Sequence, residues 1–463
     1  MGYKVLDGVR IIDLTMVYAG PMATRMLADL GAEVIKIESA SRCDVFTRAN
    51  VYPENEPGEQ PWNRGGFFHT LNAGKLGISL NLGTERGREI FKRLVSVSDA
   101  VVENFSPRVM ENWGLTYEEL RKVKPDIVMI RMSGLGHSGP LRDFYAYMPG
   151  MEAMSGLAYI TGHPDGPPLT SGSVYGDWVL GATGAAALLI ALYVRQITGK
   201  GQCVEVTGRE AIMSHIGEIL MDCILNGTDR TRMGNEHFSA APHGCYRCKG
   251  DDQWVTIAVT NDEQWESFCQ AIGNPDWTSQ EKFADALSRW KNHQELDKLV
   301  EEWTSKHDRD EVMAVLQEAG VPSGAVLNMK DLYLNPHLAQ RGLFEVIDHG
   351  AGIGKRPVLK QMPAKFTEIE EFAPRRAPQF AEHNEYVFCK LLGMPERELR
   401  ELEEAGVIGK SPVFPQGRPT RLDLITQQKS GELDPDYLGK LRVAYGQDIA
   451  LSNDNRGDPD GEN

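Results

Sequence analysis

The chain has 463 residues, of which 41% are hydrophobic and 25% charged, as in an ordinary globular protein long enough for two or more domains. Its net charge of −16 argues against a general nucleic-acid binder, although a local basic pocket for a phosphorylated ligand remains compatible with it. Seven scattered cysteines, an odd number, suit a reducing cytoplasm better than a disulfide framework.

No targeting or membrane segment is expected. The N-terminus has no basic stretch followed by an apolar run, so a secretory signal is not predicted. The uncharged run 178–194 lies at the short limit for a membrane span and predicts a core helix instead. We therefore expect a cytoplasmic protein with neither a membrane nor a nucleic-acid partner.

The first third of the chain alternates β-branched strands with helices, the pattern of a doubly wound parallel sheet. The turn after the first strand contains no GxGxxG motif, so a dinucleotide fingerprint is absent. Residues 39–66 are polar and rich in proline and glycine, which predicts an excursion from the core. The expected elements are a strand at 9–14, a helix at 22–30, strands at 34–37 and 78–82, a helix at 84–96, a strand at 100–105, a helix at 117–122 and a strand at 126–132.

A polar linker at 226–242 predicts a domain boundary, followed by a smaller unit that ends near residue 334. The tail 411–463 is predicted to be partly disordered. The remaining expected elements are a strand at 203–206, a helix at 210–225, a hairpin of 245–247 with 254–259, helices at 263–272, 277–290, 294–304 and 309–319, a closing segment at 321–326, strand or coil at 356–359 and 368–372, and helices at 382–392 and 396–405.

Polar residues gather where the predicted strands end. These are Thr15–Tyr18, Glu38, Asn104–Phe105 and Ser133–Gly136. Taken singly, each of them can be explained as a loop residue whose side chain hydrogen-bonds to nearby backbone groups. Together they converge on one edge of the sheet, where open α/β folds bind ligands, and they predict a pocket there.

Asp177 is the single carboxylate between Asp165 and Lys200, and it stands at the expected start of the core helix. The positive end of the helix dipole favours its ionised form, which would suit a nucleophile. The alternative is a simple N-cap. Cys245 and Cys248 form a lone CxxC without a second pair, so we expect two strand residues and no metal site.

Several motifs together identify a family. In chain order they are LDGVRIIDLT, AGPMATRMLADLGAEVIKIE, ENFSPRVMENWGL, GLGHSGP, GPP followed by GD, and TGKGQ. The chain resembles the class III CoA-transferases, the formyl-CoA transferase and carnitine-CoA transferase group, over about residues 4–410. The resemblance implies a Rossmann-like large domain from both chain ends (1–225 and 335–410), a small inserted α+β domain (226–334) and an interlocked dimer. It also implies acyl-CoA as substrate and no tightly bound cofactor.

By this resemblance Asp177 is the nucleophile, which forms a mixed anhydride with the donor acyl group and then an aspartyl-CoA thioester. Glycines 172, 176 and 181 either let backbone amides approach the oxyanion or serve helix packing. The positions that the resemblance assigns to CoA binding are Tyr18, Ala19, Leu80, Asn81, Leu82, Gly83, Asn104, Phe105, Ser106 and Arg108.

The chain departs from formyl-CoA transferase at three positions. Tyr18 replaces a glutamine, and Ser39 and Asn112 replace arginines. These departures put the formyl and oxalyl substrates in doubt. The cations that remain available for the CoA phosphates are Arg42, Lys75, Arg88 and Arg108.

Substrate contacts are expected from His243 and Gly244, in a segment that stands near the glycine-rich loop of formyl-CoA transferase, and from Tyr147. Bulky neighbours (Met148, Tyr175, Trp178) suggest a roomy apolar pocket for an aromatic or branched acid. The sequence is most similar to members of the family that act on aromatic succinates such as benzylsuccinate, with succinyl-CoA as donor. Such members work with an identical or a homologous subunit.

Two other functions remain open. An α-methylacyl-CoA racemase of the same superfamily needs a histidine where this chain has Tyr147, which disfavours proton transfer at the α-carbon. A non-catalytic subunit of a heteromeric CoA-transferase is disfavoured by the presence of Asp177.

Overall fold

The computed structural model describes residues 5–172, 174–350, 352–360, 362–369, 375–414, 434–447 and 449. The chain divides into two compact units. The large unit comprises 1–155, 172–217 and 336–463, and the small unit comprises 156–171 and 218–335. Segment 156–171, which the sequence analysis places in the large domain, thus belongs to the small unit. Most of the tail predicted to be partly disordered lies outside the described residues.

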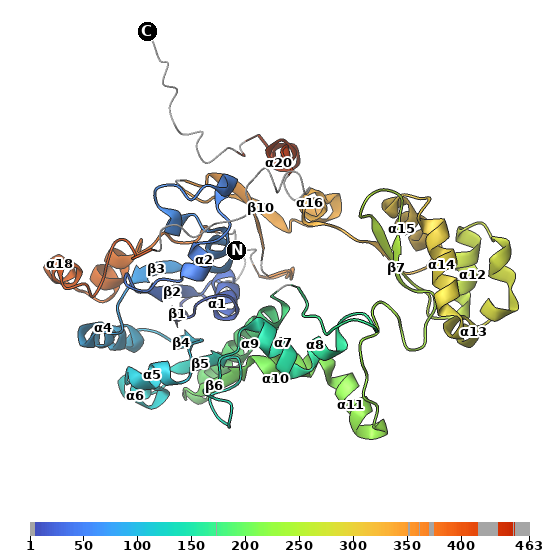
Figure 1. The fold of residues 1–463 in the computed structure, drawn as a ribbon. Coiled ribbons are helices and arrows are strands. Elements are labelled where there is room, and N and C mark those ends of the chain that lie inside the picture. The colour runs from blue at the N-terminus through green and yellow to red at the C-terminus, as the bar shows by residue number, and fades with distance from the viewer. Residues whose placement is uncertain are drawn as a thin grey trace, which may run out of the picture. The chain divides into compact units, whose positions relative to one another are not determined.

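The large unit is built on a six-stranded, fully parallel sheet in the order β3-β2-β1-β4-β5-β6 (Figure 1). The mixed α/β class and the strands expected from the sequence are confirmed, with shifts of up to three residues at their ends. The strands are β1 (Arg10–Asp13), β2 (Glu33–Glu38), β3 (Leu76–Ser79), β4 (Ala100–Glu103), β5 (Val128–Ser133) and β6 (Cys203–Thr207).

Helices and one antiparallel hairpin surround this sheet. The sequence pattern misses several short helices, because segments of four to eight residues show too little periodicity. The helices are α1 (Ala19–Asp29), α2 (Val45–Arg48), α3 (Gly66–Asn72), α4 (Glu85–Ser96), α5 (Arg108–Asn112), α6 (Tyr117–Val123), α7 (Met148–Ser155), α9 (Tyr175–Thr198), α10 (Gly208–Met213), α17 (Pro336–Gln340), α18 (Glu396–Glu404) and α20 (Tyr437–Tyr445), with a π-helical turn at Glu385–Leu391 and a hairpin of β10 (Phe344–Asp348) with β11 (Lys355–Leu359).

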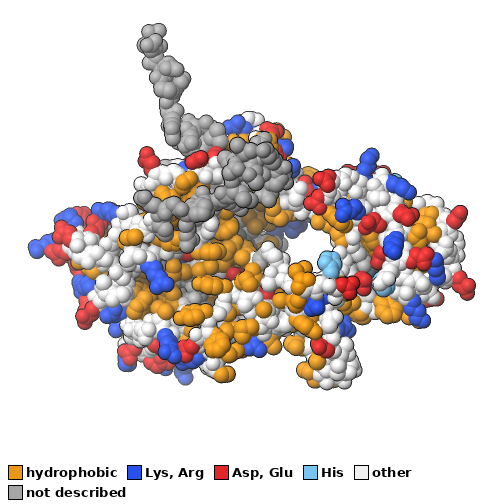
Figure 2. All heavy atoms as spheres, viewed as in Figure 1, with side chains coloured by type: hydrophobic (Ala, Val, Ile, Leu, Met, Phe, Trp, Pro, Cys, Tyr) orange, Lys and Arg blue, Asp and Glu red, His pale blue; other side chains and the backbone are white. Residues whose placement is uncertain are grey.

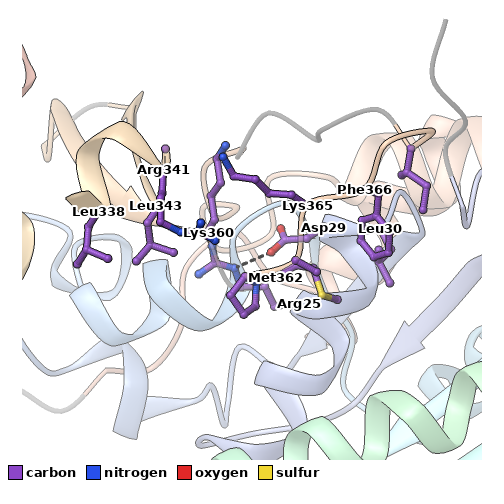
Figure 3. A pocket seen from close by; sticks show the side chains of 14 residues that line it. Arg25, Asp29, Leu30, Leu338, Arg341, Leu343, Lys360, Met362, Lys365 and Phe366 are labelled. Atoms are coloured by element: carbon purple, nitrogen blue, oxygen red, sulfur yellow. Dashed lines mark ion pairs between the residues drawn. The ribbon is translucent and has the colours of Figure 1, made fainter. Parts of the chain in front are cut away.

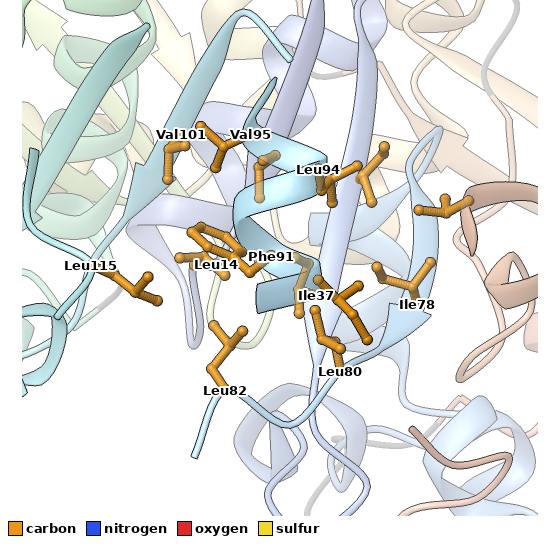
Figure 4. Packing of buried hydrophobic residues seen from close by; sticks show 14 of the residues in the cluster. Leu14, Ile37, Ile78, Leu80, Leu82, Phe91, Leu94, Val95, Val101 and Leu115 are labelled. Carbon is orange, nitrogen blue, oxygen red and sulfur yellow. The ribbon is translucent and has the colours of Figure 1, made fainter. Parts of the chain in front are cut away.

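One face of the sheet is covered by α4, whose apolar side Ile90, Phe91, Leu94 and Val95 is fully buried (Figure 4). Thr84 caps this helix through its side chain, as the sequence predicts, by accepting a hydrogen bond from the Gly87 N–H. The sheet residues in contact are in register from strand to strand, so one apolar stripe crosses the sheet. They include Ile12, Ile35, Val101 and Met129.

On the other face α9 packs against α1 and β5. A Cβ added at Gly181 would lie 2.8 Å from the Ala19 carbonyl oxygen, and one at Gly184 would lie 2.8 Å from Met132. These glycines therefore serve close helix packing. By length and composition α9 also meets the criteria for a membrane span, but core helices pass the same test, and 44% of its most apolar window is buried here.

The small unit has a three-stranded antiparallel sheet, β7 (His243–Arg247), β8 (Trp254–Ala258) and β9 (Ser323–Ala325), in this order. The predicted hairpin is confirmed. The prediction of one helix at 277–290 is wrong, because within this segment only the part from Ala286 onward is α-helical (Ala286–Lys291) and two 3-10 turns precede it. The unit's helices are α8 (Leu157–Ile160), α11 (Gly217–Asn226), α12 (Asp262–Ala271), α13 (Ala286–Lys291), α14 (His293–Thr304), α15 (Arg309–Glu318) and α16 (Met329–Leu334).

Two buried histidines make the large unit sensitive to acid. The rings of His69 on α3 and His349 after β10 meet edge-on at 5.3 Å, and each residue is 8% exposed. Burial lowers the pKa of His69 from 6.5 to about 3 and that of His349 to about 4. Below pH 6.5 the two imidazoles therefore bind protons in the unfolded chain but not in the folded chain. The contribution of these two histidines to stability is therefore fully present well above pH 6.5, and it is lost as the pH decreases toward the folded pKa values.

We expect the free energy of unfolding to drop by about 2 kcal/mol per histidine between pH 7 and pH 5. Urea titrations at both pH values measure this drop. The variant H69Q/H349Q should lose much of the difference, whereas H337Q, at an exposed position, should keep it. An equal pH difference in all three proteins would exclude the histidine pair as its cause.

Candidate active site

The strand order reverses between β1 and β4, the position at which open parallel sheets bind ligands. A cavity of ≈ 880 Å³ lies there in the large unit. Loops that follow four strands at their carboxyl ends form most of its wall, as the sequence predicts. The lining comprises residues 16–19, 42–46, 104–108, 132–136 and 142–147, with Met151, Asp177 and Leu180.

The loop after β1 is held in a strained conformation at the edge of this cavity. Val17 has φ 68°, which is unusual for a β-branched residue. Its N–H donates to Asp44 Oδ2 at 3.0 Å. Asn104 fixes the preceding residue from the other side, because its side chain exchanges two 2.8 Å hydrogen bonds with the Met16 backbone. Strain of this kind persists only where the surroundings enforce it, and it concentrates at functional sites.

Asp13, at the end of β1, organises a buried polar network directly behind this loop. Its carboxylate accepts hydrogen bonds from the Thr15 N–H and hydroxyl, from the Thr24 hydroxyl and from Lys75 Nζ at 2.8 Å. Lys36 donates to the Thr15 carbonyl. The lysines hold the pKa of Asp13 at about 2 against the opposing effect of burial. The network fixes the backbone that leads into the cavity wall.

Asp177 lines the cavity from the first turn of α9. It is not the N-cap, since Val174 occupies that position and makes no side-chain cap bond. Burial raises the pKa of Asp177 from 3.8 to about 6, and the Glu152 carboxylate adds to the rise. The pKa of Asp177 is thus higher than a stabilising helix dipole alone would give. At pH 7 a carboxyl of this pKa is still about nine-tenths ionised.

Glu152 approaches α9 from α7 and is fully buried. A Cβ at Gly176 would lie 2.8 Å from Ile212 Cδ1 and 3.6 Å from Glu152 Cγ, so this glycine also serves packing. Gly172 has a positive φ of 71° in the turn before the helix. For Gly176 and Gly181 the packing interpretation therefore accounts for the residue type.

Tyr18 stands beside Asp177 at the cavity wall. Its ring meets those of Phe67 and Trp178 edge-on, with centroids at 6.0 and 6.3 Å. Burial raises the pKa of the phenol, and the Asp177 charge raises it further. The site thus holds a neutral hydroxyl near a carboxylate that is largely ionised at pH 7.

Seven of the residues predicted to bind CoA or substrate share this cavity. They are Tyr18, Ala19, Asn104, Phe105, Ser106, Arg108 and Tyr147. Leu80, Asn81, Leu82 and Gly83 do not line it, because β3 is the edge strand of the sheet. Leu80 and Leu82 are buried in the core beneath α4, and the Asn81 side chain accepts a hydrogen bond from the Gly83 N–H.

His243 and Gly244 begin β7 of the small unit and line a different cavity of ≈ 550 Å³. His243 Nδ1 lies 3.0 Å from the Asn235 carbonyl oxygen. Nearby, Cys245 is partly buried on β7 and Cys248 belongs to the apolar core of this unit. Among the described residues no group of three or more His, Cys, Asp or Glu side chains is placed to hold a metal ion.

The four candidate cations differ in availability. Lys75 is 3% exposed and bonded to Asp13. Arg88 donates to the Leu82 and Gly83 carbonyls, outside the cavity. Arg108 lines the cavity but forms a two-pronged ion pair with Asp143, at 2.8 and 2.6 Å. Arg42 lines the cavity, is exposed, and has no side-chain hydrogen bond or ion pair to any described residue.

The sequence points to Glu38 at the end of β2 and to Arg42 as a cation, but it does not predict residues 42–46 of the following loop as part of the wall. Residues 42–46 lie within the polar excursion, and Asp44 in that loop fixes Val17. The available signal was position alone, since this loop follows a parallel strand beside β1.

Similarity to known proteins identifies the family. Residues 6–384 match the model of CoA-transferase family III. Succinyl-CoA–D-citramalate CoA-transferase of Chloroflexus aurantiacus is 34% identical over 88% of this chain and 98% of its own length. The succinyl-CoA–L-malate CoA-transferase alpha subunit from the same organism is 32% identical over 87% of both chains.

The crystal structure of a CAIB/BAIF family protein from Brucella suis superposes with a TM-score of 0.75 at 30% identity, and the match covers 84% of this chain and all of that one. The family match spans most of the chain and includes the whole cavity wall. The chain therefore belongs to CoA-transferase family III and is a CoA-transferase.

Proposed function

We propose that the enzyme transfers CoA from succinyl-CoA to a carboxylic acid with an apolar or aromatic body, and that Asp177 is the covalent nucleophile. The observation that carries the proposal is the position of Asp177, a half-buried carboxylate of pKa about 6 on the wall of a large cavity at the reversal of the sheet. Such a group is ionised at neutral pH yet more basic, hence more nucleophilic, than an ordinary aspartate.

Four steps complete one transfer. The Asp177 carboxylate attacks the thioester carbonyl of the donor, the C–S bond breaks, and CoA leaves as thiolate from a mixed anhydride. The thiolate attacks the Asp177 carbonyl carbon, and the donor acid departs as carboxylate. The acceptor carboxylate then attacks the aspartyl-CoA thioester and releases the thiolate. The thiolate finally attacks the acceptor carbonyl, which gives the new acyl-CoA and restores Asp177.

The proposed donor follows from the names of the sequence relatives, and the proposed acceptor follows from the aromatic residues of the cavity wall. Both sequence relatives described above are named for succinyl-CoA. The wall contributes aromatic side chains from several loops, which suits an acceptor larger than oxalate, such as an aromatic succinate of the benzylsuccinate type. They are Tyr18, Phe46, Phe105, Phe144, Tyr145 and Tyr147.

The test is a transfer assay with succinyl-CoA and two acceptors, benzylsuccinate and citramalate, followed by hydroxylamine trapping and mass spectrometry. We expect a new acyl-CoA, faster with benzylsuccinate, and a hydroxamate in the peptide that contains Asp177. Faster transfer to citramalate would overturn the aromatic acceptor but not the reaction. Turnover without any modified peptide would overturn the covalent route.

CoA phosphates would bind at Arg42, the exposed cation of the cavity wall that has no partner among the described residues. Replacing Arg42 by glutamine should raise KM for acyl-CoA about tenfold with little change in kcat, since a charge-assisted hydrogen bond to bound substrate is lost. R108Q is the matched comparison, because Asp143 already engages that guanidinium. A larger KM change in R108Q than in R42Q would reverse the assignment.

We further propose that the enzyme works as a dimer with a Rossmann-like large domain in each chain. Ile190, Tyr193 and Ile197 form one face of α9 and are each more than 60% exposed. Figure 2 shows hydrophobic side chains gathered on the surface of the large unit, and exposed apolar patches favour association. Sedimentation analysis should give twice the chain mass; a monomer would contradict the proposal.

A further inference from the structure

The large unit contains a second cavity, of ≈ 240 Å³, at the end of α1 remote from Asp177 (Figure 3). Helix α1 starts at Ala19, in the wall of the Asp177 cavity, and its last residue Asp29 and the C-cap Leu30 border this second one. Eleven helical residues span about 16 Å, so the two cavities are separate sites at opposite ends of one helix.

Apolar side chains form most of this wall. Leu30 comes from the end of α1, Leu338 from α17 and Leu343 from the segment before β10, while Met362 and Phe366 come from the segment after β11. Phe366 is 48% exposed, a large apolar surface to leave in water. A wall of this composition favours a compact apolar group.

The charged groups of the same wall are nearly all cationic. Arg25, Arg341, Lys360 and Lys365 face a single lining carboxylate, Asp29. Arg341 and Lys365 are exposed, and neither side chain has a hydrogen bond or ion pair to any described residue. Lys360 lies 3.6 Å from Glu345. Figure 3 shows Lys360 and Lys365 close together above the cavity, with Arg341 to one side.

Arg25 gives the cavity a fixed, buried cation. Its side chain is 1% exposed, and its guanidinium donates to the carbonyls of Thr70 and Leu359. Its Nε has no hydrogen-bond partner and lies 3.6 Å from Asp29 Oδ2. Arg25 therefore places a fixed positive charge beside Asp29 in the cavity wall.

We propose that this cavity binds a small carboxylate with a compact apolar body, such as a phenylalkanoate. The apolar group would contact the leucines and Phe366, and the carboxylate would accept hydrogen bonds from Arg341 and Lys365. The volume is well below that of the Asp177 cavity, so the site takes a free acid and not its CoA thioester. Binding here is independent of the proposed transfer reaction.

Isothermal titration of the full-length protein with 4-phenylbutanoate, without acyl-CoA, tests the proposal. We expect saturable binding of this acid and none of 4-phenylbutanol, which has the same body and no charge. R341Q/K365Q should weaken binding at least tenfold, because two charge-assisted contacts are lost. R42Q, in the other cavity, should bind as the unmodified protein does.

Thermal melting and basal CoA transfer establish that R341Q/K365Q is folded, since neither residue touches the Asp177 cavity. The proposal fails if no heat is detected at millimolar acid, if the alcohol binds equally well, or if the double variant binds normally. Loss of binding in R42Q instead would place the acid in the Asp177 cavity and would also overturn the second site.

Discussion

Replacing Asp177 by asparagine is expected to lower kcat for CoA transfer by about 10³-fold or more, because the neutral amide cannot attack a thioester as a carboxylate does. The side chain keeps its shape, and the residue lies in the first turn of α9 without any cap bond to lose. Because burial disfavours the charge of Asp177, we expect the melting temperature at pH 7 to stay the same or to rise. Steady-state transfer rates measure the loss of turnover, and hydroxylamine trapping measures the loss of the covalent intermediate.

The matched control is D143N, which makes the same chemical change in the same cavity. Asp143 is exposed and forms an ion pair with Arg108, and it belongs to a loop that precedes α9 by more than 30 residues. This variant should keep the trapped intermediate and most of the turnover, with any effect confined to KM. If D177N and D177A both retain more than about a tenth of the activity, Asp177 is not the nucleophile.

The acid side of the rate profile provides an independent check on the same residue. Only ionised Asp177 attacks, and its pKa is about 6. The transfer rate should therefore be steady above pH 7 and fall about tenfold per pH unit well below pH 6. Glu152 contributes to this pKa, so E152Q should shift the fall toward lower pH. A profile that is flat down to pH 4.5 would contradict the proposed role of the carboxylate.

Much of the large unit follows from the sequence because its strands are short, β-branched and regularly separated. The gathering of polar loops at one edge is a consequence of parallel topology, so Asn104 and Ser133 could be placed near Tyr18 without coordinates. Asp177 stands out locally as a lone carboxylate at the start of an apolar helix, but that pattern also fits an N-cap, and only the resemblance to a family assigns it as the nucleophile.

Other features depend on contacts between distant segments. The strain at Val17 arises because Asn104 and Asp44 hold the loop from both sides, and neither partner is near it in sequence. Similarly, the pKa of Asp177 follows from burial and from Glu152 on another helix. The second cavity joins the end of α1 to residues more than 300 positions later. Periodicity and local motifs contain no information about such pairs.

Asp13 shows how closely stability and the site are connected in this fold. The residue and both lysines of its network are essentially inaccessible to solvent. Removing the carboxylate in D13A leaves Lys75 buried without its acid and removes the carboxylate acceptor of the Thr15 and Thr24 hydroxyls. Losing one partner of a buried ion pair typically costs 3–5 kcal/mol, so we expect a loss of about 4 kcal/mol in urea unfolding.

The control for D13A is E119A, which breaks the exposed Glu119–Lys122 pair and should cost less than about 0.5 kcal/mol. A second variant separates charge from packing. Adding K75M to D13A removes the orphaned ammonium, and we expect it to restore part of the lost stability, since an apolar replacement avoids a buried charge. If D13A costs under 1 kcal/mol, or K75M makes it worse, the network does not anchor the loop that carries Tyr18 to the cavity.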